Sequence, residues 1–344
     1  MRLIALAPFI IWMLQTPATL YAVEGSIYWT TNHFSIKNSD LASPSDELLF
    51  NTTSLTGGIA MAVPANSIFW SGKQPDGMFR SSLDGTETQQ IVPPCGPSAL
   101  CSIGLDIEVD LNRQKVYWTE SGSRAEYAAI KRANFDGTDL ENVLTIPLVN
   151  PSALDLDFES GKIYWAEGYT PQRPGRIRRA NFDGTEIEDL LTVGLYTSNL
   201  ELDLGAGKMY WTSNNEGELW RANLDGSQSD VLMSGLSNPL AIQLDLLNNK
   251  MYWAEYYAGT IGRSNLDGTE SEVFIQSTVF GVHGMALYVV PEPSTACFLL
   301  LLFSIRFGVR PNLSHAREAA RRRAGMQSTS DLCSRTQFHS ENVG

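Results

Sequence analysis

Acidic side chains recur at a fixed spacing along this chain. In four segments an aspartate stands seven residues before a tyrosine, and these aspartates are Asp110, Asp157, Asp203 and Asp245. Three of these segments carry a second acid two residues earlier, at Glu108, Asp155 and Glu201. Calcium is bound in proteins by several oxygen ligands, many of them carboxylates. If the segments surround a common channel, the four aspartates are candidate ligands for Ca²⁺.

The sequence also offers a second role for these acids. An arginine recurs four residues before an Asp-Gly step, at Arg132, Arg179, Arg221 and Arg263. Arginine and carboxylate form strong, directional ion pairs. Because the arginines and the acids repeat in step, we favour ion pairs that join neighbouring repeats over a metal site. A catalytic site is expected to break the repeat in one or two units, and these rows do not break.

A longer repeat positions the acids. A hydrophobic residue, an aromatic residue and a tryptophan occur together six times, ending at Trp29, Trp70, Trp118, Trp165, Trp211 and Trp253. Successive tryptophans are 41 to 48 residues apart, and a period of roughly 40 to 50 residues is typical of propeller blades and other stacked units. The repeat covers residues 23–290 and therefore indicates one domain.

Each repeat predicts four antiparallel strands. Apolar and acidic residues alternate in the first strand, with the period of two that a strand has. The second strand carries the aromatic-tryptophan pair and is bulky on both faces. The third leads into an Asp-Gly hairpin turn, and a short fourth strand follows. The sequence therefore predicts an all-β fold, a six-bladed β-propeller of four-stranded antiparallel blades, with the aromatic pairs packed between blades.

The two ends of the repeat region predict how the ring closes. The first tryptophan triplet comes before any strand of the alternating type, and a strand that fits the vacant place occurs at residues 284–290. An open junction between the first and last blades would expose strand edges. We therefore expect the C-terminal strand to become the innermost strand of the first blade.

Two repeated phrases carry a family resemblance. Residues 115–120 (Lys-Val-Tyr-Trp-Thr-Glu) and 132–138 (Arg-Ala-Asn-Phe-Asp-Gly-Thr) resemble the YWTD repeats of the low-density-lipoprotein-receptor class B family. The resemblance extends over about residues 25 to 290 and implies a six-bladed propeller that binds protein ligands. Every repeat replaces the family's final aspartate, and the residues found there are Thr31, Gly72, Glu120, Glu167, Ser213 and Glu255.

Residues 1–22 have the order of an export signal, with Arg2, an apolar stretch at 3–14 and the small residue Ala22. The apolar stretch is shorter than the roughly 20 residues that a transmembrane helix needs. We therefore expect a signal peptidase to remove the segment. Export leads to an oxidising compartment. Cys95 and Cys101 flank a short loop and are a candidate disulfide there.

Residues 291–323 resemble the PEP-CTERM protein-sorting signal of exopolysaccharide-producing bacteria, which an exosortase reads. The box Pro291-Glu292-Pro293 precedes an apolar run at 296–305, and arginines follow at Arg306, Arg310 and 321–323. The run is about half as long as a membrane span, and arginines favour the cytoplasmic side. We expect a transient or anchored membrane contact through 296–305. Residues 324–344 are a polar tail that we expect to be disordered.

Charge and motifs exclude several classes of function. Residues 23–290 carry 17 Lys and Arg against 34 Asp and Glu, and such an acidic body is unsuited to nucleic acid, whose phosphates need clustered basic residues. The sequence contains no GxSxG, no HExxH and no phosphate-binding glycine loop. His283 precedes the closing strand, and we interpret it as structural.

These observations favour a non-enzymatic binding module, exported and sorted to the cell surface, outer envelope or extracellular matrix of a bacterium. Its ligand is a protein or a polysaccharide. Loops on a rigid propeller are the expected binding surface, and the candidate contacts are Tyr169, Tyr196, Tyr256 and Tyr257. Two alternatives stay open. One is a calcium-dependent hydrolase similar to the six-bladed lactonases of the gluconolactonase type, with the metal in the channel. The other is a purely structural matrix component.

Overall fold

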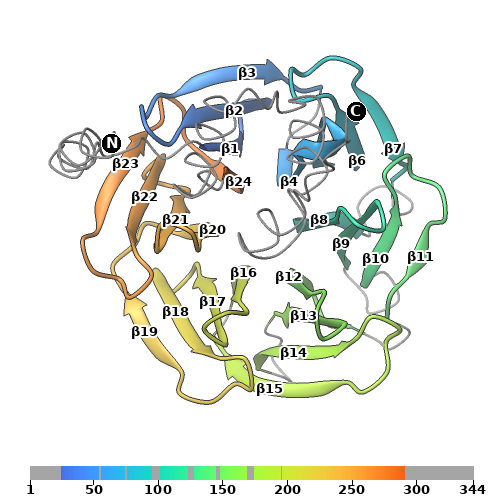
Figure 1. The fold of residues 1–344 in the computed structure, drawn as a ribbon, viewed down its shortest axis with the longest axis vertical. Helices are drawn as coiled ribbons and strands as arrows, with labels where there is room; N and C mark the ends of the chain where they lie inside the picture. The colour runs from blue at the N-terminus through green and yellow to red at the C-terminus, as the bar shows by residue number, and fades with distance from the viewer. Residues whose placement is uncertain are drawn as a thin grey trace, which may run out of the picture.

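Six four-stranded sheets surround a central channel in the computed structural model of this chain (Figure 1). The structure describes residues 25–53, 56–73, 76–94, 101–122, 128–144, 148–168, 174–194 and 196–290. All pairings within the sheets are antiparallel, and each sheet is one blade of a propeller. The predicted fold class is confirmed. Within the ranges just given, no helix has the length and apolar composition needed to cross a membrane.

The first three blades run from the channel outward in the following order. Blade 1 comprises β24 (Val282–Val289), β1 (Gly25–Thr31), β2 (Ser35–Asp40) and β3 (Glu47–Asn51). Blade 2 comprises β4 (Thr56–Ala62), β5 (Ser67–Lys73), β6 (Asp76–Ser81) and β7 (Gln89–Val92), with the 3₁₀ turn η1 (Val63–Ala65) between β4 and β5. Blade 3 comprises β8 (Cys101–Asp110), β9 (Lys115–Gly122), β10 (Ala129–Asn134) and β11 (Glu141–Asn142).

The other three blades keep the same order. Blade 4 comprises β12 (Pro151–Asp157), β13 (Lys162–Glu167), β14 (Gly175–Asn181) and β15 (Glu188–Val193). Blade 5 comprises β16 (Thr197–Asp203), β17 (Lys208–Ser213), β18 (Glu218–Asn223) and β19 (Asp230–Met233). Blade 6 comprises β20 (Pro239–Asp245), β21 (Lys250–Glu255), β22 (Thr260–Asn265) and β23 (Glu272–Gln276).

The ring closes where the sequence predicts. In Figure 1 the orange β24 lies beside the blue β1, and in this pair Gly25 stands opposite Val289. The predicted strand at 284–290 is thus the innermost strand of blade 1, with its observed start two residues earlier at Val282. β24 therefore pairs with the inner edge of β1 and completes the four strands of blade 1.

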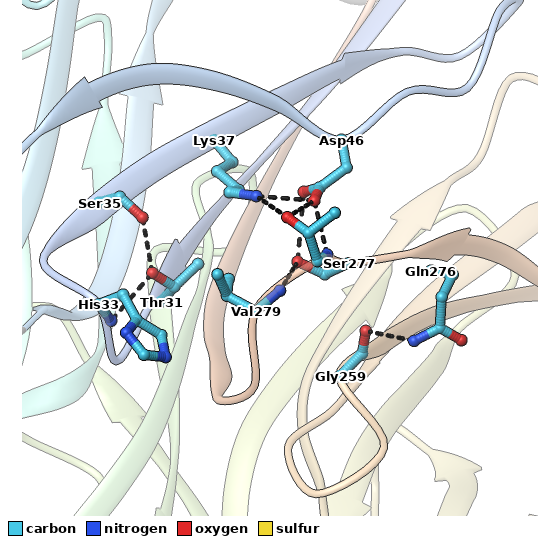
Figure 2. A network of polar contacts seen from close by, with 10 residues as sticks. Thr31, His33, Ser35, Lys37, Asp46, Gly259, Gln276, Ser277 and Val279 are labelled. Atoms are coloured by element: carbon cyan, nitrogen blue, oxygen red, sulfur yellow. Dashed lines mark hydrogen bonds and ion pairs between the residues drawn. The ribbon is translucent and has the colours of Figure 1, made fainter.

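A polar network reinforces the closing seam between blades 1 and 6 (Figure 2). The Lys37 ammonium lies 2.7 Å from an Asp46 carboxylate oxygen, and both side chains are largely buried. Asp46 also accepts hydrogen bonds from the loop after β23, from the Ser277 hydroxyl at 3.2 Å and the Thr278 N–H at 2.6 Å. The buried lysine and aspartate are therefore paired, which lowers the cost of burying each charge.

The aromatic pair of each second strand packs against two different blades. Trp165 joins the apolar cluster between blades 3 and 4, whereas the adjacent Tyr164 joins the cluster between blades 4 and 5. Successive residues of a strand point to opposite faces, which explains the division. All six tryptophans are at most 3% exposed. The described residues form six apolar clusters, one at each interface between blades, which confirms that the aromatic pairs are packing residues.

The glutamate that follows the tryptophan in three blades has a structural role. The indole N–H donates to the carboxylate two residues later, from Trp118 to Glu120, Trp165 to Glu167 and Trp253 to Glu255. In blades 1 and 2 the corresponding residues are Thr31 and Gly72, and the buried indole nitrogens of Trp29 and Trp70 have no hydrogen-bond partner among the residues that the structure describes. Glutamate therefore satisfies a buried donor that would otherwise be costly to bury.

The propeller has two distinct faces. The turn face carries the turns between first and second strands and the Asp-Gly turns between third and fourth strands. Backbone hydrogen bonds join the two kinds of turn, for example from Phe182 N to Gly161 O at 3.0 Å. The loop face carries the connections between second and third strands and those between blades, which are joined likewise, as from Asn214 N to Tyr196 O at 3.1 Å.

Glycine in the Asp-Gly turns contacts the neighbouring blade. Gly226 has φ +82°, and a Cβ built on it would lie 2.3 Å from the carbonyl oxygen of Leu190 in blade 4. Gly207 also has a positive φ, +66°, but a Cβ there would meet no atom of the described residues within 4 Å. Alanine substitutions at the two positions therefore distinguish the cost of the backbone conformation from the cost of the contact between blades.

We expect Gly207→Ala to lower the free energy of unfolding by about 1 kcal/mol, the cost of the left-handed conformation alone. Gly226→Ala should cost about 3 kcal/mol, because the methyl group also displaces the backbone of blade 4. Urea denaturation of both variants measures the difference. Equal losses in the two variants would contradict the contact between blades.

Candidate functional site

The channel is lined by polar side chains of the innermost strands. The acids Glu108, Asp155 and Glu201 occupy equivalent positions on β8, β12 and β16, and Gln243 takes this position on β20. The Gln243 amide donates to Glu201 Oε1 at 2.5 Å, so neighbouring members of the row are in contact. Burial raises the pKa of Glu108, and the nearby Asp155 carboxylate raises it further. The row therefore forms one electrostatic unit within the channel.

Channel side chains hydrogen-bond to the backbone of the next blade. The acceptor and donor pairs are Asp106 Oδ2 with Leu154 N (2.9 Å), Asp155 Oδ2 with Leu202 N (2.7 Å), Asn199 Oδ1 with Ile242 N (2.7 Å) and Gln243 Oε1 with Leu287 N (3.2 Å). The channel edge of an innermost strand has no strand partner, so its buried N–H groups need other acceptors. These side chains supply them and join the blades.

Asp106 and Asn199 form a second layer nearer the loop face. The Asn199 amide donates to Asp106 Oδ1 at 2.9 Å, which links blade 5 to blade 3 inside the channel. Both residues are at most 6% exposed. Sequence reasoning missed them because neither recurs in other repeats. Their positions could have indicated a place in the channel, since each stands two residues before a predicted channel acid and therefore points to the same side of its strand.

The four channel carboxyl groups resist ionisation. Burial raises the pKa of Asp106 to about 8 and that of Asp155 to about 7. Burial and the neighbouring carboxylates also raise the pKa of Glu108 and of Glu201 well above their ordinary values. Charged carboxylates are disfavoured where protein walls replace water and like charges are close. Near neutral pH the channel therefore holds protons on some of these groups.

Calcium coordination requires convergent oxygen atoms, and the described residues offer no such group. Among them, no three His, Cys, Asp or Glu side chains are gathered closely enough to hold a metal ion. Several channel oxygens accept backbone or side-chain hydrogen bonds instead. Chemically, the channel row is suited to joining blades and to sharing protons.

The four aspartates predicted as calcium candidates lie at the turn-face ends of the innermost strands. Each accepts hydrogen bonds within the turn that follows, as from Arg113 N to Asp110 Oδ1 at 2.9 Å and from Ser160 N to Asp157 Oδ1 at 2.9 Å. Asp203 and Asp245 likewise accept from Ala206 N and Asn248 N. An aspartate that bonds to the backbone two or three residues onward stabilises a tight turn. These carboxylates fix the turns between first and second strands.

The predicted pairing of the recurrent arginines with this row is wrong. Each arginine pairs instead with an acid on the fourth strand of its own blade, and these acids are Glu141 for Arg132, Glu188 for Arg179, Asp230 for Arg221 and Glu272 for Arg263. The reason is geometric, because third and fourth strands are adjacent whereas the aspartates are two strands away. Blades are nevertheless joined by arginine, since Arg132 Nη1 reaches Phe182 O of blade 4 at 3.4 Å.

The channel mouth on the loop face contains a small polar cluster. The imidazole Nε2 of His283 lies 2.5 Å from Asn32 Oδ1, and the Asn32 amide donates to the Tyr256 hydroxyl at 2.6 Å. The His283 and Tyr256 rings pack edge to face with centroids 5.0 Å apart. A pocket beside this cluster is lined by Asp106, Asn199 and His283. The pocket therefore combines a carboxyl, an amide and an imidazole at the entrance to the channel.

Exposed aromatic side chains gather on the same face. They are Phe34 at 44%, Tyr196 at 52%, Tyr257 at 65% and Phe280 at 70% exposed, and we call them the aromatic arc. Their loops belong to blades 1, 5 and 6 and are joined by backbone bonds such as Gly281 N to Tyr256 O at 3.1 Å. Large exposed aromatic groups on neighbouring loops are typical of binding surfaces.

The structure brings three predicted binding residues to this face. Tyr196 and Tyr257 belong to the aromatic arc, and the half-buried Tyr256 supports His283 behind it. Phe34 and Phe280 were not predicted, although each lies in a loop that joins the expected strands. Several other predictions lie outside the described residues: the export signal 1–22, Tyr169, Cys95 and the side chain of Cys101, the box Pro291-Glu292-Pro293, the run 296–305 and the tail 324–344.

The sheets, the repeated aromatic pairs and the channel define this chain as a six-bladed β-propeller. Residues 114–158 match the family model of the low-density lipoprotein receptor repeat class B. No curated protein sequence matches the chain.

Solved structures share the fold. A chain in the crystal structure of a nidogen/laminin complex aligns with a TM-score of 0.65 and 20% identity, over 76% of this chain and 97% of that one. TolB from Acinetobacter baumannii aligns with a TM-score of 0.60 and 10% identity, over 78% and 67%. A putative TolB from Agrobacterium tumefaciens gives 0.57 and 11%, over 79% and 100%. At these identities the likeness shows the fold alone.

Proposed function

We propose that this protein is an exported, surface-sorted bacterial propeller that binds a protein or glycan ligand without transforming it. The aromatic arc is the observation that carries the proposal. A folded protein gains nothing in stability from leaving four large aromatic side chains in water on connected loops, whereas a ligand gains contact area from them. The envelope or the extracellular matrix is the setting, and the export and sorting segments of the sequence support it.

The use of the channel groups also supports a binding role. The acids that a channel-centred hydrolase would need are engaged in hydrogen bonds between blades, as at Asp106 and Asp155. The chain that aligns from the nidogen/laminin structure is part of a complex between proteins. A similar role for this chain is part of the proposal and rests on its own exposed aromatics.

Replacing Tyr257 and Phe280 together with alanine should weaken ligand binding by at least about 30-fold, the effect of losing a hot spot of roughly 2 kcal/mol. The measurement is biolayer interferometry of purified protein against fractionated polysaccharide and protein from the native envelope. Val273→Ala is the matched control, since Val273 is 62% exposed but lies on the outer strand β23 of blade 6. If the double variant and the control bind equally well, the aromatic arc is not the binding surface.

Calcium analysis distinguishes the hydrolase alternative. We expect protein purified from calcium-containing buffer to hold no ion in stoichiometric amount after desalting, as measured by atomic emission. One tightly held ion per chain, lost in the Glu108→Gln variant, would favour the calcium-dependent hydrolase over a binding module. Equal ligand binding with and without a chelator would support the binding module.

The mature protein should begin after Ala22, because a signal peptidase removes residues 1–22. An exosortase-like enzyme should process the chain after the propeller. Peptide mass mapping of the protein isolated from its own cell envelope tests both cleavages. Recovery of peptides from residues 1–22 in the surface-bound protein would overturn the export proposal, and peptides beyond Arg323 would overturn processing.

A further inference from the structure

Phe34 has a backbone conformation that is unusual for its side chain. It lies in the loop between β1 and β2 with φ +54°, in the left-handed region that disfavours any residue with a Cβ atom. Among the described residues, ten others besides glycine have a positive φ, and all ten are Asn, Asp, Gln or Glu. Phe34 is therefore the one apolar side chain that the described part of the propeller holds in this conformation.

Glycine stands at the equivalent position in two other blades, with φ +68° at Gly217 and +65° at Gly259. In all three loops the carbonyl group of this residue accepts a hydrogen bond from the segment after the fourth strand. The pairs are Phe34 O with Thr52 N (2.6 Å), Gly217 O with Leu236 N (2.9 Å) and Gly259 O with Ser277 N (2.9 Å). The loop forms equally well with glycine, so the fold does not require the Phe34 ring.

The Phe34 side chain is 44% exposed and belongs to the aromatic arc. Its loop meets the loops of Tyr257 and Phe280 where blades 1 and 6 join (Figure 2). Backbone hydrogen bonds join the loop of Phe34 to that of Phe280 at 3.0 Å, and the loop of Phe280 to that of Tyr257 at 3.1 Å. We call these three residues the seam patch. An exposed ring that is held in an unfavourable conformation beside other exposed rings points to a contact outside the chain.

The polar groups of the three loops are already engaged. Asn32 bonds to both Tyr256 and His283, and the Glu255 carboxylate accepts an indole N–H and a backbone N–H. A glycan carries many hydroxyl groups, and each hydroxyl that is buried needs a hydrogen-bond partner. The seam patch therefore fits apolar protein side chains better than it fits sugar.

The surroundings of the seam patch are acidic. Five loop-face segments of blades 1, 5 and 6 lie next to it, at residues 31–35, 213–218, 233–241, 255–260 and 276–283, and they contain three glutamates but no lysine or arginine. One of these acids, Glu216, is exposed. A basic group matches this charge, whereas a second copy of the acidic propeller or an anionic lipid surface would be repelled.

We propose that the seam patch anchors a protein ligand, which places an apolar side chain among Phe34, Tyr257 and Phe280 and a basic residue toward Glu216. Phe34 keeps its unfavourable conformation because that conformation presents the ring to the ligand. The ligand class and the role of Phe34 both depend on the binding function proposed above. Folding and binding thus favour different residues at position 34.

Fluorescence anisotropy with short labelled peptides tests the ligand class. A peptide with a Lys-Leu-Trp-Lys core should bind the purified protein at least about tenfold more tightly than peptides with Lys-Ser-Ser-Lys or Glu-Leu-Trp-Glu cores. The second peptide lacks the apolar part and the third lacks the basic part. Glu216→Gln should weaken binding of the first peptide about threefold. Equal affinities for the three peptides would overturn the proposed ligand class.

Phe34→Gly removes the ring and its strain together. We expect it to weaken binding of the Lys-Leu-Trp-Lys peptide at least about fivefold. The midpoint of urea denaturation should stay at or above that of the unchanged chain, because relief of the left-handed conformation offsets the packing that is lost. Phe34→Tyr keeps a ring and should keep the affinity. A lower midpoint would assign Phe34 to packing, and either this result or an unchanged affinity in Phe34→Gly would overturn its binding role.

Glu87→Gly is the matched control for strain. Glu87 also has φ +54°, but it follows the Asp-Gly turn of blade 2 on the turn face. Glycine there should raise the midpoint of urea denaturation and leave peptide binding unchanged. A loss of peptide binding in Glu87→Gly would show that relief of strain anywhere in the propeller weakens binding, which would overturn the specific role of Phe34.

Fractions of the native envelope distinguish failure of the seam patch from failure of the binding function. If the protein fraction binds equally well to Phe34→Gly and to the unchanged chain, the binding function stands and the seam patch is not its site. If only the polysaccharide fraction binds, the binding function stands and the ligand class is wrong. If no fraction binds the purified protein, the binding function fails, and the seam patch fails with it.

Discussion

Glu167→Ala should lower the free energy of unfolding by about 3 kcal/mol, the typical cost of removing one partner from a buried charge network. The Glu167 side chain is 1% exposed and lies 2.9 Å from the guanidinium groups of both Arg176 and Arg178. It also accepts the indole N–H of Trp165 at 3.2 Å. The substitution leaves a buried donor unsatisfied and weakens the hold on two arginines, so the interface between blades 3 and 4 loosens. Urea denaturation measures the loss.

The matched control is Glu188→Ala. Glu188 also pairs with an arginine of blade 4, Arg179 at 2.8 Å, but its side chain is 45% exposed. An exposed pair contributes at most about 1 kcal/mol. Glu167→Gln is a second control, because an amide keeps an acceptor for the indole and removes only the charge. Similar losses for Glu167→Ala and Glu188→Ala would show that burial does not set the energy of this network.

The propeller should become less stable as the pH rises from about 4 to 8. In the unfolded chain Asp106 titrates near its ordinary value, whereas in the folded channel its pKa is raised to about 8. A group with a raised pKa contributes stability that is complete below the unfolded pKa and is lost as the pH rises through the folded one. Asp155, raised to about 7, acts in the same direction. The midpoint of urea denaturation, measured at unit steps of pH, should fall steadily over this range.

The propeller should also become less stable below about pH 4, because the aspartates of the Asp-Gly turns then become protonated. Hydrogen bonds in the Asp-Gly turns lower the pKa of exposed aspartates, to about 2 at Asp84. A lowered pKa contributes stability above the unfolded pKa that is lost as the pH falls through the folded one. Together the two sets predict a maximum near pH 4, close to the ordinary pKa of an aspartate, because the first set loses stability above it and the second below it.

Glu108→Gln tests the origin of the alkaline loss. The amide keeps the size of the side chain and removes one of the four channel carboxyls, so the profile between pH 6 and 9 should flatten. Glu87→Gln is a control, since Glu87 is exposed in a turn away from the channel. A profile that stays unchanged in Glu108→Gln would mean that the channel carboxyls do not cause the alkaline loss.

Much of the fold was predictable because the residues that pack between blades follow short repeated patterns in the sequence. The aromatic-tryptophan pairs repeat with the period of a blade, and alternation along a strand sends the two rings into different interfaces, as at Tyr164 and Trp165. The place of β24 followed from a strand missing at one end and present at the other. These features depend only on sequence period and strand geometry.

The channel was less predictable because its contacts join residues far apart in the sequence. The two acids of each innermost strand look alike in the sequence, yet Asp155 bonds to the next blade whereas Asp157 caps its own turn. Asp106 and Asn199 pair across 93 positions without any repeat to reveal them. The arginine partners were wrong for a similar reason, since strand order within a blade places Glu141 rather than Asp110 beside Arg132.

The closure by β24 also sets how the propeller responds to mechanical load. Gly25 and Val289 stand opposite each other at the same end of an antiparallel pair. A force that separates these two residues opens the pair one hydrogen bond at a time, like a zipper, instead of shearing all the bonds together. Tension between the two ends of the propeller would therefore peel blade 1 first, starting at Gly25 and Val289.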